Sequence, residues 1–240
     1  MKKKLETFDP SAFHRIKDAE NRHFWFISRK KWIFSCIKQF VPAPAKVLEI
    51  GCGTGNVSNF LAKKGFTVIG CELYHEAIML SWPGFIKIQG DANTLPFQNN
   101  SFDIVGLFDI IEHFQNDRTS LKEAFRVLKK GGIVVLTVPA RKELWSCFDE
   151  RGFHKKRYTK KILRSLLRET GLKPLLIQYM FMSLYFPMRF VRGQKNQKVN
   201  PFEINKLLNS FLTRFFDVER LVSKTFHLPI GTSLIAVARK

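Results

Sequence analysis

The sequence predicts an α/β fold in which a doubly wound, mostly parallel sheet of seven strands carries helices on both faces. Short β-branched apolar runs alternate with apolar positions at helical spacing, which is the pattern of such folds. The first run ends in a turn with three glycines at alternate positions, Gly51, Gly53 and Gly55. Hydrophobic residues make up 45% of the 240 residues, which is enough for a substantial core.

Seven segments are predicted as strands: 47–50, 67–71, 85–88, 102–108, 133–138, 175–179 and 232–238. A helix after the fourth strand is expected to stop at Gly131 and Gly132, because glycine commonly ends helices. A helix after the fifth strand is expected to start at Thr159 as its N-cap and to stop at Gly171. Its inward-facing residues are expected to be Ile162, Leu163, Leu166 and Leu167.

Two appendages are predicted around this core. Residues 1–45 form a basic N-terminal cap with a helix over 21–34, in which Phe24, Ile27, Lys31 and Phe34 share one line and Arg22, Arg29 and Lys30 lie elsewhere. Residues 181–231 separate the last two strands, although connections in α/β folds usually have about 2–6 residues. This insert contains an aromatic stretch over 181–192, a polar stretch over 193–198 and an amphipathic helix over 203–220.

The charge of the chain is unevenly distributed. The formal net charge is +20, yet residues 47–140 carry eight basic and nine acidic side chains. The segments 1–46, 141–180 and 181–240 each carry a net charge of +7. The excess therefore lies outside the glycine-turn region, and it favours an anionic acceptor, a nucleic acid or an anionic membrane surface as a partner.

The cysteines and the apolar runs exclude several classes of protein. Four cysteines are scattered without a C-x-x-C pair, so neither a zinc site nor a disulfide framework is expected. The basic start at 1–4 is not followed by an apolar segment of about 7–15 residues, so no signal peptide is expected. No run reaches the ~20 apolar residues of a spanning helix. A cytoplasmic location is predicted, with membrane association left open.

The acid before the glycine turn indicates the kind of ligand. Glu49 lies two residues before Gly51, and the spacing G-x-G-x-G differs from the dinucleotide fingerprint G-x-G-x-x-G. A carboxylate there would repel a pyrophosphate and would suit a positively charged ligand, such as the ammonium and sulfonium of S-adenosylmethionine. At this stretch the chain resembles the class I S-adenosylmethionine-dependent methyltransferases, whose first motif reads E/D-x-G-x-G-x-G.

The resemblance extends over most of the chain. The string F-D-x-V…E-H…R-V-L-K-x-G-G…V-P, within residues 102–139, is similar to the ubiquinone-biosynthesis and related small-molecule branch of that family. The segment H-x-W-F-x-x-R-x-x-x-I over 23–33 and the ending G-T-S-L-I-A-V-A-R-K resemble other members. The resemblance implies a Rossmann-like sheet with an antiparallel last strand, and a methyltransferase domain over 46–240 whose cofactor pocket the N-terminal cap helps to cover. The alternative for the helix over 21–34 is a helix on a membrane surface.

The residues expected at the cofactor follow from these motifs. Glu72, at the tip of the second strand, can accept hydrogen bonds from ribose hydroxyls. In the family, the acid of the G-D-A motif, here Asp91, lies near the adenine amino group. The full set expected to bind S-adenosylmethionine is Glu49, Gly51, Cys52, Gly53, Gly55, Glu72, Leu73, Asp91, Ala92, Phe108 and Asp109.

Two histidines are candidates for catalysis. Methyl transfer from a sulfonium is an in-line displacement that depends on alignment, and a hydroxyl acceptor also needs a base. His113 follows the fourth strand, and His154 lies beside Lys155, Lys156 and Arg157, which either hold an anionic acceptor or form a solvated basic loop. Asp109, Glu112 and His113 match a pattern through which some ubiquinone-type relatives bind a divalent ion. We expect instead that the acids order the loop, and we predict no metal.

The predicted function is S-adenosylmethionine-dependent methylation of a small-molecule or lipid-linked acceptor, by O-methylation. The charge leaves an RNA methyltransferase as an alternative, although the chain has no N/D-P-P-Y tetrapeptide and no appended RNA-binding module. A non-catalytic binding protein is a third alternative, against which the intact glycines, Glu49, Glu72 and Asp91 argue. The insert at 181–231 is interpreted as a lid, a membrane contact or a dimer surface, and the oligomeric state stays open.

Overall fold

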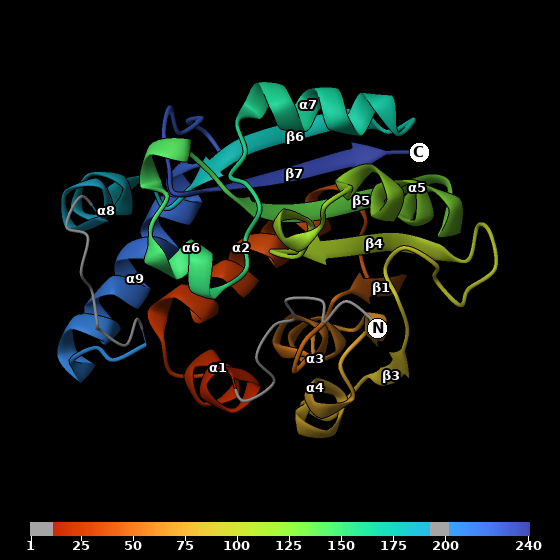
Figure 1. Cartoon of the computed structure of the whole chain (residues 1–240), viewed down its shortest axis with the longest axis horizontal. Helices are drawn as coiled ribbons and strands as arrows, with labels where there is room; N and C mark the ends of the chain where they lie inside the picture. The colour runs from red at the N-terminus through yellow and green to blue at the C-terminus, as the bar shows by residue number, and fades with distance from the viewer. Residues whose placement is uncertain (1–11, 193–201) are drawn as a thin grey trace, which may run out of the picture.

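The computed structural model describes residues 12–192 and 202–240 (Figure 1). The basic start at 1–4 and the polar stretch at 193–198 lie outside these described residues. The boundary between a cap over 1–45 and a domain over 46–240 stays a prediction.

One sheet of seven strands forms the centre of the molecule (Figure 1). Its spatial order is β3-β2-β1-β4-β5-β7-β6, and β7 is antiparallel to both of its neighbours. The predicted fold and the antiparallel last strand are confirmed. The central strands are continuous apolar runs because they are covered on both faces. The strands are β1 (Lys46–Ile50), β2 (Thr67–Glu72), β3 (Ile86–Gln89), β4 (Phe102–Phe108), β5 (Leu128–Pro139), β6 (Lys173–Met180) and β7 (Ser233–Arg239).

Helices cover both faces of this sheet. α5 and α7 lie on one face, and α2 lies with α3 and α9 on the other (Figure 1). The helices are α1 (Ala12–Glu20), α2 (Phe24–Phe40), α3 (Asn56–Ala62), α4 (His75–Leu80), α5 (Asp117–Val127), α6 (Cys147–Arg151), α7 (Lys160–Glu169), α8 (Tyr185–Arg192) and α9 (Lys206–Val222). Three short 3-10 turns are η1 (Ile111–His113), η2 (Lys142–Leu144) and η3 (Met182–Leu184).

Two expected helix details differ from the structure. α5 ends at Val127 instead of at the glycine pair, and Lys129–Gly132 belong to β5. Gly132 serves a close approach there, since a Cβ on it would lie 2.8 Å from the Asp103 carbonyl oxygen. In α7, Thr159 is the N-cap as predicted and accepts a hydrogen bond from the Ile162 backbone N–H. The Ile162 side chain is 41% exposed, however, because the buried face of α7 is centred on Leu163, Leu166 and Leu167.

The N-terminal segment forms two helices instead of one. The Nδ1 of His23 caps α2 by accepting a hydrogen bond from the Trp25 backbone N–H at 3.3 Å. Arg29, which the sequence placed off the buried line, is buried. Lys31, which the sequence placed on that line, is only half-buried and its Nζ lies 2.5 Å from Asp217 of α9. Contacts with distant parts of the chain therefore set the rotation of α2.

The second half of the insert is integrated into the fold. Phe216 of α9 is fully buried and stacks on Phe24 of α2, with 5.6 Å between ring centroids. Asn209 accepts a hydrogen bond from the Phe24 backbone N–H at 2.8 Å. The buried carboxylate of Glu219 accepts hydrogen bonds from the backbone N–H groups of Met182 and Ser183, which joins α9 to the segment before α8. Within the described ranges, no helix is long and apolar enough to cross a membrane.

Phe216→Ala is expected to lower the free energy of unfolding by about 3–5 kcal/mol, because it empties a buried aromatic site. Phe211→Ala is the matched control on the same helix, since its side chain is 60% exposed; its change should stay within about 0.5 kcal/mol. Urea unfolding of the two variants measures both values. Equal losses in the two variants would contradict the packing of α9 on α2.

Candidate active site

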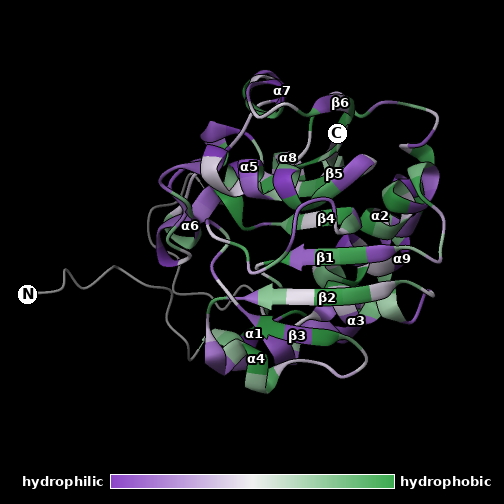
Figure 2. Cartoon of the chain, turned by 90° about the vertical axis from the view of Figure 1, so that its right-hand side faces the viewer, coloured by the Kyte–Doolittle hydropathy of each residue, from purple (hydrophilic) through white to green (hydrophobic). Residues whose placement is uncertain are grey.

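The predicted cofactor residues gather at one edge of the sheet. β1 pairs in parallel with β2 and β4, so that Ile50 lies beside Cys71 and Leu107. The carboxyl ends of these strands therefore meet at the same edge, where open α/β sheets bind ligands. Figure 2 shows β1, β2 and β4 pointing the same way. The glycine turn follows β1, Asp109 follows β4, and Glu72 is the last residue of β2.

The three glycines of the turn have different roles. All have positive φ angles, +66° at Gly51, +55° at Gly53 and +79° at Gly55. A Cβ on Gly51 would lie 2.6 Å from Ile110, and a Cβ on Gly55 would lie 2.2 Å from Phe85. A Cβ on Gly53 would meet nothing within 4 Å. The first and third glycines thus allow tight packing, and Gly53 offers bare backbone to a ligand.

Glu72 fixes the turn from the neighbouring strand. Its carboxylate accepts hydrogen bonds from the backbone N–H groups of Gly53 at 2.7 Å, Leu73 at 2.8 Å and Tyr74 at 3.1 Å. A carboxylate has about four acceptor sites, so capacity remains for a ribose hydroxyl. Burial raises the pKa of Glu72, and the three backbone donors act against that rise.

The other predicted cofactor residues flank this turn. Leu73 is exposed, Ala92 is half-buried, and Asp91 is exposed and accepts a hydrogen bond from the Asn93 backbone N–H at 2.8 Å. Cys52 is buried, and burial together with Glu49 and Glu72 raises the pKa of its thiol well above the usual value. The thiol is therefore neutral and packs against Gly70.

Glu49 presents a buried carboxyl beneath the turn. It accepts a hydrogen bond from the Ser58 hydroxyl at 2.5 Å. Burial raises its pKa to about 7, and Ser58 and Arg29 only partly offset this effect. A cationic ligand nearby would favour the ionised form. The glycine cradle, Glu72 and Glu49 thus fit the ribose and positively charged groups of S-adenosylmethionine.

A buried acid of α1 joins the N-terminal segment to the glycine turn. The Glu20 carboxylate accepts hydrogen bonds from the Thr54 hydroxyl at 2.5 Å and from Trp82 Nε1 at 2.6 Å. Its carbonyl accepts one from the Asn56 side chain at 3.1 Å. Burial raises the Glu20 pKa. Sequence reasoning missed Glu20, because nothing local distinguishes it from the other acids of the segment.

Arg29 joins α2 to the end of β4. Its guanidinium donates a hydrogen bond to the Phe108 carbonyl at 2.9 Å, forms an ion pair with Asp109 and lies 5.1 Å from the Trp25 ring. Asp109 has a φ of +54° and also accepts a hydrogen bond from the Thr137 hydroxyl at 2.9 Å. Arg29 was not predicted as a site residue, although the H-x-W-F-x-x-R segment contains it.

A pocket of about 230 Å³ lies next to this edge. One wall is apolar and comes from α2, the end of β5 and the insert; the other carries titratable groups from the loops after β4 and β5. The lining residues are Trp25, Asp109, Glu112, Pro139, His154, Arg157, Leu184, Met188, Thr232 and Ser233. The pocket is therefore suited to a small molecule with an apolar body and a polar reacting group.

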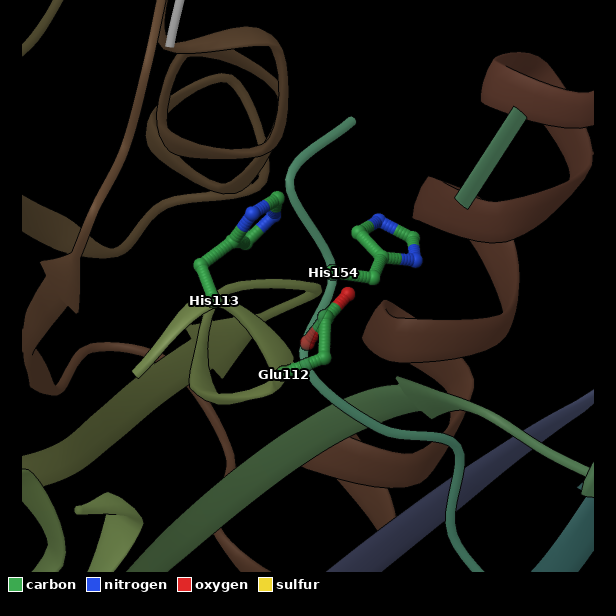
Figure 3. A group of neighbouring side chains, drawn as sticks. All are labelled: Glu112, His113 and His154. Atoms are coloured by element: carbon green, nitrogen blue, oxygen red, sulfur yellow. The ribbon is translucent and has the colours of Figure 1, made fainter. Parts of the chain in front are cut away.

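Glu112 and His154 line this pocket, and His113 lies beside them (Figure 3). Their potential ligand atoms lie within 4.8 Å of one another. Glu112 is fully buried, and among the described residues its carboxyl oxygens have no hydrogen-bond partner. Burial and the nearby Asp109 raise its pKa well above the usual value, which favours the protonated carboxyl.

The structure changes the metal hypothesis. Asp109 is occupied by Arg29 and Thr137, as expected for an acid that orders the loop. His154 takes its place beside Glu112 and His113. The raised pKa of Glu112 acts against binding of a divalent ion at this group, because a carboxylate ligand must be ionised. The set Asp109, Glu112 and His113 is thus not brought together as a ligand set.

The two histidines differ as bases. His154 Nδ1 lies 3.0 Å from the buried Asp149 carboxylate, and Arg157 donates to both oxygens of that carboxylate at 2.8 and 3.0 Å. Because Asp149 accepts, Nδ1 carries the proton and Nε2 is the basic nitrogen. Burial and the neighbouring His154 lower the pKa of His113 to about 4. His113 is therefore a weak base, and His154 is the better candidate.

The basic loop does not present all its cations to an acceptor. Arg157 binds Asp149 and the Ala140 carbonyl. Lys156 forms an ion pair with Asp117 at 2.6 Å, whereas Lys155 is exposed. Two of the three cations thus stabilise the loop itself, and an anionic acceptor beside them stays a prediction.

The comparisons with known proteins agree with this geometry. The family model described as "Methyltransferase domain" matches residues 20–177. The chain is 31% identical over 134 residues to a 2-methyl-6-phytyl-1,4-hydroquinone methyltransferase of Synechocystis, a match that covers 53% of the chain and 40% of that protein. It is 28% identical over 135 residues to a tRNA (carboxymethyluridine(34)-5-O)-methyltransferase of Arabidopsis thaliana, over 54% of the chain and 33% of that protein.

Solved structures show the same fold. An S-adenosylmethionine-dependent methyltransferase of Thermotoga maritima aligns with a TM-score of 0.62 at 19% identity, over 96% of this chain and 95% of that one. At this identity the likeness concerns the fold alone. The matched part of the chain spans less than half the length of the two curated relatives. The family model covers well over half of the chain, and the chain belongs to the S-adenosylmethionine-dependent methyltransferases.

Gly53→Ala is expected to weaken S-adenosylmethionine binding by at least about tenfold, because the methyl group would fill the open space over the turn. Gly131→Ala is the matched control: its φ is +78°, a Cβ there would also meet nothing within 4 Å, and it lies in β5 away from the turn. The backbone strain of the two variants should therefore be similar. Isothermal titration measures affinity, and equal weakening in both variants would contradict the cradle.

Glu49→Gln is expected to stabilise the free protein at pH 8. The Glu49 pKa rises from 4.5 to about 7 on folding, so the unfolded state loses its proton first as pH rises, and stability falls between these values. At about 1.4 kcal/mol per pKa unit, the cost at pH 8 is about 3 kcal/mol. Melting curves at pH 5 and 8 should show a gain mainly at pH 8, and titration should show weaker cofactor binding. The same gain at both pH values would contradict titration of Glu49.

Proposed function

We propose that the protein transfers the methyl group of S-adenosylmethionine to a hydroxyl of a small-molecule or lipid-linked acceptor bound in the 230 Å³ pocket. The observation that carries this proposal is the His154–Asp149 pair at the pocket wall, with Nδ1 held at 3.0 Å. Such a pair can serve as a general base, which a hydroxyl acceptor needs because it loses a proton when it is methylated.

The chain's own residues contribute binding and proton transfer. When bound, S-adenosylmethionine supplies an electrophilic methyl group. Trp25, Leu184 and Met188 hold the acceptor body and exclude water. His154 Nε2 takes the hydroxyl proton as the oxygen forms its new bond, and the Asp149 carboxylate stabilises the resulting imidazolium.

Glu112 supports a polar acceptor group. A buried polar group without a partner costs about 1–3 kcal/mol, and both Glu112 oxygens are in this position. In its protonated form, which burial favours, the Glu112 carboxyl can donate a hydrogen bond to an oxygen of the acceptor. Binding of an oxygenated ring or headgroup would therefore remove that cost, which an apolar ligand could not do.

An RNA acceptor is the second candidate. The net charge of +20 and the likeness to a tRNA methyltransferase favour it. The apolar pocket wall and the likeness to a phytyl-hydroquinone methyltransferase favour the small or lipid-linked acceptor. Binding to tRNA, measured at low and at high salt, tests the RNA candidate. Binding through phosphate contacts weakens steeply as salt rises, so binding that persists at high salt would favour an RNA acceptor.

His154→Asn is expected to lower the rate of methyl transfer by about 10²–10⁴-fold, the usual contribution of a general base. His113→Asn is the matched control and should have a much smaller effect, because its pKa of about 4 makes it a weak base. Transfer of labelled methyl to a panel of phenols and hydroquinones measures the rate. Cofactor affinity should be unchanged in both variants, and an unchanged rate in His154→Asn would overturn its role as base.

A further inference from the structure

Exposed apolar side chains are concentrated on the insert. Of fifteen large hydrophobic side chains that are exposed in the described part of the chain, ten lie between residues 186 and 226. Single exposed hydrophobics are ordinary, whereas a cluster marks an interaction surface. The ten, here called the insert face, are Phe186, Phe190, Leu207, Leu208, Phe211, Phe215, Val218, Leu221, Val222 and Phe226.

The two faces of α9 are both apolar. One packs on α2 through Phe216. The outward face carries Leu207, Phe211, Phe215 and Val218 at spacings of four, four and three residues, where a surface helix normally carries polar groups. α8 follows η3, to which Glu219 joins α9, and it exposes Phe186 and Phe190. Packing of the fold does not account for these outward residues.

The exposed charges described on α8 and α9 have one sign. On α9, Asp217 pairs with Lys31 and Arg220, and Glu219 is buried on backbone donors. Every exposed charged side chain described on α8 and α9 is basic: Arg189, Lys206 and Arg214. Lys224 follows α9, and the acidic Glu203 lies before its first turn. An apolar surface edged by cations is complementary to an anionic lipid interface.

We propose that the insert face docks on the surface of an anionic lipid bilayer, with its aromatic and aliphatic side chains at the interface and its cations on the headgroups. A second copy of the chain is a poorer occupant, since it would bring the same basic side chains together on molecules that each carry +20.

The docked orientation also connects the membrane to the pocket. α8 contributes Met188 to the pocket wall and exposes Phe186 and Phe190 on its outer side. A bilayer in contact with α8 thus lies next to the pocket, and a lipid-linked acceptor would reach His154 without crossing water. This last step rests on the proposed function, whereas the docking itself does not.

Vesicle flotation of the full chain tests the docking. We expect binding to phosphatidylcholine vesicles that contain phosphatidylglycerol, little binding to phosphatidylcholine alone, and release at high salt. The double variant Phe211→Ser with Phe215→Ser should weaken binding by at least about tenfold, because it removes two inserted rings. Met79→Ser is the matched control, since Met79 is 71% exposed on α4 and lies outside the insert face; its binding should be unchanged.

A second pair of variants tests the cations. Arg214→Glu should weaken binding to the anionic vesicles, and Lys161→Glu, an exposed site on α7, should have a smaller effect. Melting curves and S-adenosylmethionine titration verify that every variant is folded. Docking is overturned if wild type does not bind anionic vesicles, or if the double variant binds as wild type does. It is also overturned if sedimentation shows a dimer that the double variant abolishes.

The outcomes also separate docking from the proposed reaction. Transfer to water-soluble phenols needs no vesicles, so loss of docking leaves that assay intact. If the protein binds vesicles but transfers no methyl group, the proposed acceptor is wrong and the docking proposal still stands.

Discussion

The arrangement of the site depends on one buried carboxylate. Glu72 binds the backbone N–H groups of Gly53, Leu73 and Tyr74, and so ties the turn after β1 to the turn after β2. Held in this way, the glycine turn keeps its left-handed backbone and leaves Gly53 facing open space. Thr54, the next residue, then has the position from which it donates to Glu20, and the N-terminal helices close over the same edge.

An excess of buried acids explains why this edge suits a cation. Burial raises the pKa of Glu20, Glu49, Glu72 and Glu112, and the buried Arg29 already pairs with Asp109. Each of these carboxyls would be more stable in its ionised form if a positive charge came near. A sulfonium and an ammonium supply that charge, whereas a pyrophosphate would add to the repulsion. In the sequence, Glu49 alone indicated a positively charged ligand. The fold brings several further acids to the same edge, and they favour the same kind of ligand.

The parts of the site that the sequence predicted are local. A strand, a glycine turn and a helix follow one another within residues 46–62, and Glu72 ends the next strand, so the cofactor edge could be recognised. Arg29 and Glu20 could not, because their partners lie 79 and 34 residues away along the chain. His154 and its partner Asp149 are close in sequence. The pair also depends on Arg157, which turns inward to bind Asp149, and a run of basic residues does not indicate which of them turns inward. Likewise Ile162 fits the helical period and is still exposed, because the neighbouring strand determines where the buried face ends.

The cations of the flanking segments differ in whether they are paired within the chain or exposed. Near His154, Arg157 and Lys156 form ion pairs with carboxylates of the same chain. This part of the positive charge therefore stabilises a loop and is less available to a partner. On α8 and α9, Arg189, Lys206 and Arg214 stay exposed, since the two acids of α9 are engaged by Lys31, Arg220 and backbone donors. Net charge alone could not distinguish these two uses, since each flank carries the same +7. Burial distinguishes them: a cation that serves a partner must remain hydrated until the partner arrives. By this criterion the exposed cations of the insert, and not Arg157 and Lys156, are available to an outside partner.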